Sequence, residues 1–468
     1  CTKQRDYYMI PNHAWLNPSK SQLTFTQEQQ DILDSTEPAI LVNAVAGSGK
    51  TSVLMEMAKK YSNGLYLAFN KAIVTDVLDK LPNGWSCKTF NSFGLRLIYE
   101  NAKDIKVDFN KYKKMYGEEP SVRLAQHHMV LGGNASEASW KDTANRFTVS
   151  TAYIPEAKRI LKGGLAASSV VSGDEMLEYP IRNGWQSEHY DIVLVDECQD
   201  LNPQQIKLLS CIPTDRIVFV GDLNQAIYGF RGSDPRAISF LKEQYSTVSY
   251  PMNESFRCPI EVLTEVKHIV PKITSKKTGG RVYQMSKAHV QYPEECFITS
   301  RTNASLIKLA YRLIHDNEPF SISAKFVNSL KSSLNYVLKT SANIQIVRDS
   351  LLKQYNKEIA IFETKSWNAS NMHDKYNGLF SIVNNCSTIE EVHAFIKRMT
   401  LHTNSSSPRK LLTIHGVKGL ETSHIYFLDP DMCAYFKNKT RVKWEKQQED
   451  NLYYVACTRA LESLTFVR

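Results

Sequence analysis

Ala44-Val45-Ala46-Gly47-Ser48-Gly49-Lys50-Thr51 follows an apolar run, Ala39-Ile40-Leu41-Val42, and precedes a segment that we expect to be helical from Ser52 to Tyr61. The stretch fits the phosphate-binding pattern GxxxxGK[ST], except that its first position is Ala instead of Gly. Small residues allow backbone N–H groups to wrap around phosphates, and the N-terminus of the following helix adds a favourable field. Lys50 is placed to contact the β and γ phosphates of a nucleotide, and the Thr51 hydroxyl to hold Mg²⁺. The alternative is a chance turn of small residues between a strand and a helix.

Further apolar runs rich in β-branched residues recur along the chain and alternate with helical patterns. Runs of this kind are typical of parallel strands that are buried on both faces. We therefore predict an α/β fold. The runs of a first set are 39–42, 64–69, 192–195 and 217–220, and those of a second set are 296–299, 410–414 and 424–428. A long interruption divides each set, and we expect each interruption to form an inserted subdomain.

A second chemical feature lies at the end of the run Ile192-Val193-Leu194-Val195. Asp196 follows this predicted strand, where a carboxylate can hold magnesium. The adjacent Glu197 is placed to orient and deprotonate an attacking water. Gln225 follows the next predicted strand, where a side-chain amide can respond to the γ-phosphate. Together with the phosphate loop, these residues predict a site that hydrolyses ATP.

In this order the residues closely resemble the UvrD/Rep/PcrA family of superfamily 1 helicases, with some likeness to the F-box DNA helicase branch. The resemblance runs from about residue 22 to the end of the sequence. It implies two RecA-like parallel-sheet domains of the P-loop NTPase fold, each with an inserted, mainly helical subdomain. The predicted divisions are an N-terminal extension 1–20, domain 1A at 21–102 and 187–250, insert 1B at 103–186, domain 2A at 251–316 and 406–468, and insert 2B at 317–405.

The resemblance also assigns nucleotide-binding roles, with ATP and Mg²⁺ as the expected substrate and cofactor. Ala46, Gly47, Ser48, Gly49, Lys50 and Thr51 form the phosphate loop, and Thr51 and Asp196 are the metal ligands. Phe25-Thr26-Gln27-Glu28-Gln29-Gln30 resembles the Q motif, which implies that Gln29 contacts the adenine edge. Asn253-Glu254-Ser255-Phe256-Arg257-Cys258-Pro259 implies that Phe256 stacks on adenine and that Arg257 faces the γ-phosphate. Glu421 is expected near the ribose, Gln225 as the γ-phosphate sensor and Arg459 as a second arginine finger. An arginine at an element end is, however, most often a surface ion pair.

DNA contacts are implied by the same resemblance. The predicted residues are Phe69, Asn70, Thr89, Asn91, Tyr228, Phe230, Arg231, His415 and Lys418. Two departures concern this set: the family often has His where Asn91 stands, and the aromatic residue in Phe69-Asn70-Lys71 is shifted against the usual pattern. The alternative for Tyr228 and Phe230 is a buried edge. Three basic stretches, 111–116, 272–281 and 435–444, are either DNA contacts or solvated faces.

The composition is compatible with a nucleic-acid-dependent ATPase but does not by itself predict one. The 468 residues include 57 Lys plus Arg and 48 Asp plus Glu, giving a net charge of +9. That excess is modest and by itself is typical of an ordinary surface. The nine cysteines are unclustered, which argues against a disulfide framework and a structural zinc site. No run reaches the roughly 18 apolar residues of a membrane span. We expect a cytoplasmic or nucleoid-associated protein in a prokaryote or virus, and a nuclear one in a eukaryote.

The resulting prediction is an ATP-dependent DNA helicase or translocase that moves 3′ to 5′ on single-stranded DNA and acts on tailed duplexes. The form His415-Gly416-Val417-Lys418-Gly419-Leu420-Glu421 favours this polarity by resemblance. Protein partners in replication, repair or recombination are compatible with it. The alternative is a DNA-stimulated ATPase that acts as a remodeller or motor subunit without processive unwinding. A third possibility, an inactive DNA-binding relic, is disfavoured because the expected catalytic residues are all present.

Overall fold

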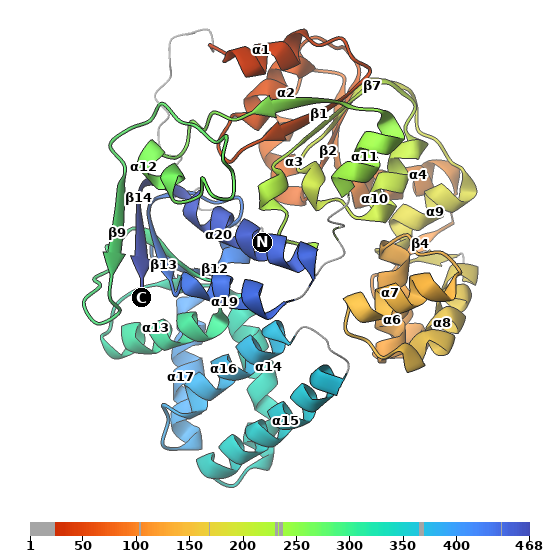
Figure 1. Ribbon diagram of the computed structural model, residues 1–468. Helices are drawn as coiled ribbons and strands as arrows, with labels where there is room; N and C mark the ends of the chain where they lie inside the picture. The colour runs from red at the N-terminus through yellow and green to blue at the C-terminus, as the bar shows by residue number, and fades with distance from the viewer. Residues whose placement is uncertain are drawn as a thin grey trace, which may run out of the picture.

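The computed structural model describes residues 24–102, 104–167, 169–229, 233, 237–364, 369–440 and 442–468. The predicted N-terminal extension 1–20 therefore lies outside the described residues. Two six-stranded sheets form the centres of two lobes (Figure 1), and every strand pair in both sheets is parallel. The predicted α/β class with two RecA-like domains is confirmed.

The first sheet contains the phosphate loop at the end of one of its central strands. Its strand order is β3-β2-β6-β7-β1-β8. The strands are β1 (Ala39–Ala44), β2 (Gly64–Ala68), β3 (Trp85–Thr89), β6 (Tyr190–Val195), β7 (Thr214–Gly221) and β8 (Val248–Met252). The helices are α1 (Gln27–Asp34), α2 (Lys50–Ala58), α3 (Lys71–Leu78), α4 (Phe90–Asn101), α10 (Pro203–Leu208) and α11 (Ala237–Tyr245), with short 3₁₀ turns η2 (Cys198–Asp200), η3 (Leu209–Cys211) and η4 (Leu223–Gln225).

Successive residues of the central strands are buried on opposite faces of this sheet. Leu41, Val193 and Phe219 belong to one hydrophobic cluster. Their neighbours Val42 and Leu194 belong to another. Helices cover both faces, which is why these strands appear in the sequence as continuous apolar runs.

The second sheet has the order β11-β12-β10-β13-β14-β9. Its strands are β9 (Arg281–Met285), β10 (Cys296–Ser300), β11 (Ser321–Ile322), β12 (Arg409–Thr413), β13 (Thr422–Leu428) and β14 (Ala460–Val467). The helices of this lobe are α12 (Ile260–Thr264), α13 (Asn303–His315), α18 (Ile414–Val417), α19 (Asp431–Lys439) and α20 (Lys443–Cys457).

The two inserts are mainly helical, and they lie at the right and at the bottom of Figure 1. The first contains α5 (Lys111–Tyr116), α6 (Pro120–Val130), α7 (Glu137–Arg146), η1 (Thr151–Tyr153), α8 (Ile154–Ala166) and α9 (Glu175–Asn183), with the two-stranded pair β4 (Lys106–Val107) and β5 (Val170–Val171). The second contains α14 (Ala324–Thr340), α15 (Ile344–Thr364), α16 (Ser370–Val383) and α17 (Ile389–His402).

Parts of both predicted inserts pack with the lobes instead of with the rest of their insert. Leu177 of α9 is buried in the core of the first lobe. β11, inside the range 317–405, pairs with β12 and forms an edge of the second sheet. The second insert also shares one continuous hydrophobic cluster with its lobe, in which Leu334 and Leu379 pack with Leu411. By contrast, α5 to α8 of the first insert have a core of their own around Trp140 and Ile160.

Two expectations from the composition concern membrane spans and cysteines. Within the described residues, no helix is both long and apolar enough to cross a membrane. Eight cysteines lie in the described part of the chain, and all are buried free thiols.

Candidate active site

The phosphate loop leaves β1 and turns into α2 through two glycines with positive φ. Gly47 has φ +72° and Gly49 has φ +82°, a backbone region that other residues adopt only with strain. A Cβ atom on Gly47 would lie 2.4 Å from the Cβ of Arg257, and one on Gly49 would lie 3.0 Å from Nε2 of Gln29. Both positions therefore require glycine, and the loop is a concave backbone cradle at a helix N-terminus. Thr51 lies exposed in the first turn of α2.

Carboxylates from the neighbouring strand ends surround the ammonium group of Lys50. Lys50 Nζ lies 3.1 Å from Glu197 Oε1. Burial alone would lower the pKa of Lys50, but the charges of Glu197, Asp222 and Asp196 outweigh burial and raise it. Asp196 is 5% exposed and accepts a hydrogen bond of 2.7 Å from the Tyr66 hydroxyl. The cluster thus holds one lysine cation among three acidic groups.

The two adjacent carboxylates differ in their preference for charge. Burial and the nearby Glu197 raise the pKa of Asp196. Burial would also raise the pKa of Glu197, but Lys50 and Lys418 outweigh it and lower that pKa. A bound divalent cation would stabilise the charged form of Asp196, so the residues fit the predicted Mg²⁺. Glu197 has φ +52°, and strain of this kind in a non-glycine residue is concentrated at functional sites.

Asp222 joins the predicted phosphate sensor to the second lobe. Its carboxylate accepts hydrogen bonds from Gln225 Nε2 at 2.7 Å and from the Tyr454 hydroxyl at 3.0 Å. The same Tyr454 hydroxyl accepts a hydrogen bond of 2.8 Å from the backbone N–H of Ala46. Burial raises the pKa of Asp222, while Lys50 acts against that shift. Sequence reasoning gave Tyr454 no role; its only signal was its position five residues before Arg459.

The segment after β8 contacts the phosphate loop directly. Ser255 Oγ donates to the Ala46 carbonyl at 2.7 Å, and the Phe256 N–H donates to the Gly47 carbonyl at 2.8 Å. The Phe256 ring is 51% exposed and lies beside Gly49. Gln29 Nε2 donates to the Ser48 carbonyl at 3.0 Å, so Gln29 and Phe256 flank the loop.

The two predicted arginine fingers lie close together but differ in exposure. Arg257 Nε pairs with Glu421 Oε2 at 2.7 Å, with 20% of its side chain exposed. Arg459 is 1% exposed, and its guanidinium donates to the Val455 carbonyl at 3.1 Å and to the Thr458 hydroxyl at 3.1 Å. Burial and the positive charge of Arg257 lower the pKa of Arg459 to about 10. The two residues therefore meet between α20 and the loop, with Arg257 nearer to solvent.

Three of the predicted DNA-contacting rings converge from both lobes. Phe69 and Tyr228 stack with centroids 5.7 Å apart and planes 8° apart, and His415 lies 6.3 Å from Tyr228. Lys418 Nζ lies 4.8 Å above the Tyr228 ring. The Lys418 ammonium also pairs with buried Asp200 and donates to the Gln225 carbonyl at 2.7 Å. Sequence reasoning missed this link between the lobes.

Of the other residues predicted to contact DNA, those that the structure describes make hydrogen bonds to nearby backbone groups. The Asn70 and Thr89 side chains cap α3 and α4 by accepting from Ile73 N and Ser92 N. Asn91 Nδ2 donates to the Gly173 carbonyl at 2.8 Å. Phe230 and Arg231 lie outside the described residues.

The basic stretch 111–116 is not a uniform solvated face. Lys111 is 4% exposed and pairs with Glu175, and Tyr112 is 1% exposed in the core of the first insert. These two residues form α5 contacts that hold the insert together, so they are not available to DNA. In the stretch 272–281, Lys276 pairs with Glu254 and is largely exposed, as expected of a solvated face.

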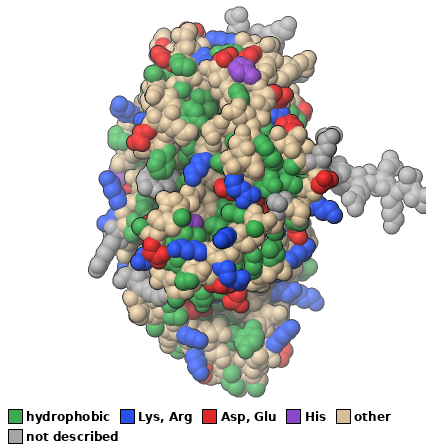
Figure 2. Space-filling model, turned by 90° about the vertical axis from the view of Figure 1, so that its right-hand side faces the viewer, with side chains coloured by type: hydrophobic (Ala, Val, Ile, Leu, Met, Phe, Trp, Pro, Cys, Tyr) green, Lys and Arg blue, Asp and Glu red, His purple; other side chains and the backbone are tan. Residues whose placement is uncertain are grey.

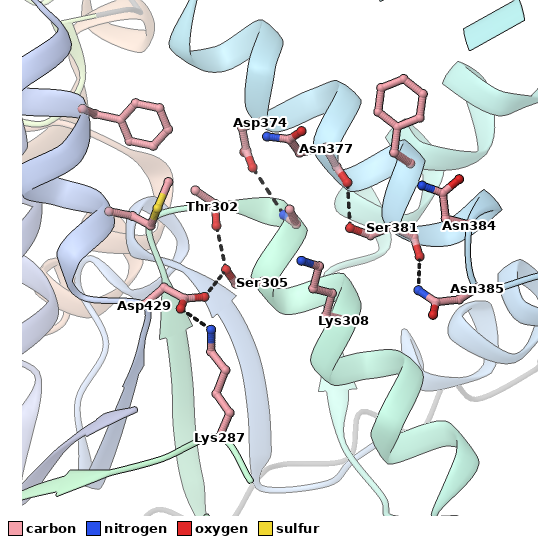
Figure 3. Close-up of a pocket in the computed structure, with 14 residues that line it drawn as sticks. Lys287, Thr302, Ser305, Lys308, Asp374, Asn377, Ser381, Asn384, Asn385 and Asp429 are labelled. Carbon is pink, nitrogen blue, oxygen red and sulfur yellow. Dashed lines mark hydrogen bonds and ion pairs between the residues drawn. The ribbon is translucent and has the colours of Figure 1, made fainter. Parts of the chain in front are cut away.

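A separate cavity of about 580 Å³ lies between α13, α16 and α19 (Figure 3). Lys308 and the polar side chains of Asn377 and Asn384 line it, and Asp429 on its wall binds Ser305 and Lys287. None of the residues predicted for the nucleotide or for DNA lines this cavity. This cavity is therefore distinct from the candidate active site.

Comparison with known proteins gives an independent result. The UvrD/REP helicase N-terminal domain model matches residues 172–246, which include Asp196, Glu197 and Gln225. The chain is related to the UvrD/REP helicases. F-box DNA helicase 1 of Gallus gallus is 25% identical over 95% of this chain and 49% of its own length. F-box DNA helicase protein 1 of Schizosaccharomyces pombe is 25% identical over 99% of this chain and 59% of its own length. The chain thus spans about half the length of these relatives.

Proposed function

We propose that this UvrD-related chain hydrolyses ATP and uses the reaction to move 3′ to 5′ along single-stranded DNA and to separate duplexes. One observation carries the proposal: Lys50, Asp196 and Glu197 meet at a glycine cradle whose main chain is hydrogen-bonded by Tyr454 and Ser255. The loop that would hold the phosphates is therefore in direct contact with the second lobe.

The residues divide the hydrolysis between them. The phosphates of ATP would compete with Glu197 for the Lys50 ammonium, and Glu197 would then be released to accept a proton from water. Asp196 and Thr51 would hold Mg²⁺, which neutralises charge on the β and γ phosphates. Arg257 is positioned to exchange its ion pair with exposed Glu421 for the γ-phosphate.

The base and the DNA would occupy neighbouring surfaces. The exposed ring of Phe256 and the amide of Gln29 support adenine binding beside Gly49. The Phe69–Tyr228–His415 rings support stacking of unpaired bases, since every base has a π-face. Figure 2 shows Lys and Arg side chains beside hydrophobic ones, with Asp and Glu side chains among them, on the middle of that face. The names of the relatives support DNA as the nucleic acid, and the Lys418–Gln225 contact supports coupling to hydrolysis.

The test compares the wild-type chain with Lys50→Ala and Glu197→Gln. We expect each variant to lose ATP turnover by roughly 10²–10³-fold or more, because each removes a group that stabilises or activates the reacting atoms. Lys59→Ala is the matched control, since Lys59 follows the same helix but its side chain is 63% exposed. Turnover that persists in Lys50→Ala would refute the site assignment.

Unwinding separates this proposal from its alternative. Duplexes with a 3′ tail, a 5′ tail or no tail are incubated with the wild-type chain, ATP and Mg²⁺. Preferred separation of the 3′-tailed duplex supports the helicase with the proposed polarity, and preference for the 5′ tail contradicts that polarity. DNA-stimulated turnover without strand separation assigns the chain to the remodeller or motor-subunit class. The shared core of the second insert and its lobe favours that alternative, because it limits independent motion of the insert.

A further inference from the structure

Phe109 is the most exposed of the large hydrophobic side chains in the described part of the chain, with 74% of its surface open. It lies in the loop between β4 and α5, where the first insert joins its lobe (Figure 1). Removing an aromatic ring of this size from water is favourable, so an exposed ring can contribute substantially to binding.

The loop around Phe109 is held by its backbone. The Asp108 N–H donates to the Val171 carbonyl at 2.9 Å, and the Lys111 N–H donates to the Asp108 carbonyl at 3.0 Å. The Asp108 side chain also accepts from the Asn110 N–H at 2.9 Å and pairs with Lys114, which compensates its charge. The ring is therefore presented on a fixed backbone, which lowers the entropy cost of binding.

Gly173 supports one side of the ring. A Cβ atom at Gly173 would lie 3.0 Å from Cδ1 of Phe109, closer than ordinary contacts allow. The Gly173 carbonyl accepts the hydrogen bond from Asn91, at the start of α4. The exposed ring is thereby connected to the carboxyl end of β3.

The carboxyl end of β3 lies next to the stacked rings of Phe69 and Tyr228. Thr89 of β3 is the register partner of Ala68 in β2, and Phe69 follows Ala68 directly. Neighbouring strands lie about 4.8 Å apart, so Asn91 and Phe69 start from adjacent positions on one sheet edge. Lys71 follows Phe69 at the start of α3, and Lys106 lies in β4 shortly before Phe109; both are exposed and supply positive charge for a phosphate backbone.

We propose that Phe109 stacks on an unpaired base and extends the strand-binding line of Phe69 and Tyr228 onto the first insert. The ligand is a single-stranded nucleic acid, and the inference rests on the proposed function of the chain. A strand that reaches only Phe69 and Tyr228 would not touch Phe109, whereas a longer strand would. Phe109 thus sets the length of strand that the protein holds.

Binding of labelled oligothymidylates of about 4 to 16 nucleotides tests this, measured by fluorescence anisotropy at one fixed salt concentration. Wild-type affinity should rise with length, and Phe109→Ala should lose roughly 5- to 50-fold for the long strands while matching the wild type for the shortest. Tyr153→Ala is the control, because Tyr153 is another exposed ring of the same insert. Phe109→Trp should restore long-strand affinity, and its added tryptophan fluorescence should be quenched by the long strands.

The outcomes distinguish a failure of the role of Phe109 from a failure of the proposed function. Equal affinities of wild type and Phe109→Ala at every length would overturn the role of Phe109 while leaving the proposed function intact. Absence of binding by the wild type at every length would overturn both. An equal loss at all lengths, or a lowered melting temperature of Phe109→Ala without rescue by Phe109→Trp, would mark a structural role and also overturn it.

Discussion

Replacing Lys418 by Met tests whether its buried ion pair holds the two lobes together. The Lys418 side chain is 8% exposed and that of Asp200 is 1% exposed. Asp200 Oδ1 has no hydrogen-bond partner among the described residues, and Gln199 Nε2 lies 3.4 Å from Oδ2. Methionine keeps most of the apolar stem of lysine but removes the charge, so Asp200 would remain buried without a cation. Loss of one partner of a buried pair generally costs about 3–5 kcal/mol.

The pH dependence follows from the carboxyl group. Burial raises the pKa of Asp200 to about 6, although Lys418 acts in the opposite direction. Without Lys418 the pKa in the folded state rises further, so the folded variant binds a proton that the unfolded chain releases. Between the ordinary pKa and pH 6, wild type and variant lose stability together as the pH rises. Above pH 6 only the variant continues to lose stability, by about 1.4 kcal/mol per pH unit. We expect little difference at pH 5.5 and a deficit of up to about 3 kcal/mol at pH 8.

Urea denaturation at pH 5.5 and pH 8, followed by tryptophan fluorescence, measures this deficit in the first unfolding transition. The first transition is used because two lobes need not unfold together. Lys113→Met is the matched control, since its ion pair with Glu118 is exposed and should contribute well under 1 kcal/mol at either pH. The double variant Asp200→Asn, Lys418→Met should lose the pH-dependent part of the deficit. A deficit that is equal at both pH values, or absent at pH 8, would refute the reasoning.

Three further predictions concern the nucleotide loop and the second lobe. Gly47→Ala should weaken binding of a fluorescent ATP analogue at least tenfold, because its Cβ would meet Arg257 at 2.4 Å; Gly117→Ala, with φ +81° but no atom within 4 Å, should leave binding unchanged. Phe256→Ala should weaken the same binding roughly 3- to 10-fold without lowering the melting temperature, since the ring is half-exposed and its contribution is stacking. Arg301→Lys should destabilise the second lobe by about 1–3 kcal/mol in calorimetry, because lysine cannot reproduce the two hydrogen bonds of 2.8 and 2.7 Å that Arg301 makes to a buried glutamate; an unchanged melting profile would contradict this.

Most of the strands outside the predicted apolar runs share one physical property. All of the central strands of the first sheet, β2, β6, β7 and β1, were predicted from their continuous apolar runs. Of the strands outside those runs, β3, β8, β9 and β11 are the four edges of the two sheets, and β14 is interior. An edge strand is partly exposed, and β9 is exposed at four of its five positions, so no apolar run marks it.

In the candidate site, too, some features could be predicted from the sequence and others could not. Local patterns indicated the phosphate loop and the carboxylates Asp196 and Glu197, because each is contiguous with a predicted strand, but they gave no role to Asp222 at the end of the next strand. The contacts of Tyr454 with Ala46 and of Lys418 with Asp200 join residues 408 and 218 positions apart. Such partners depend on how the two sheets pack against each other, which no local pattern contains. The buried position of Arg459 was missed for the same reason.

These long-range contacts give the proposed coupling a physical route. Glu197, which is placed to activate water, accepts a hydrogen bond from Gln199, and the next residue, Asp200, pairs with Lys418. Lys418 in turn lies over the Tyr228 ring that stacks on Phe69. The charge of Lys418 also lowers the pKa of Glu197, so a change in charge at Glu197 acts on the Lys418 ammonium. Because that one ammonium contacts Asp200, the Gln225 carbonyl and Tyr228, repositioning it during hydrolysis would alter the surface that we propose stacks on bases.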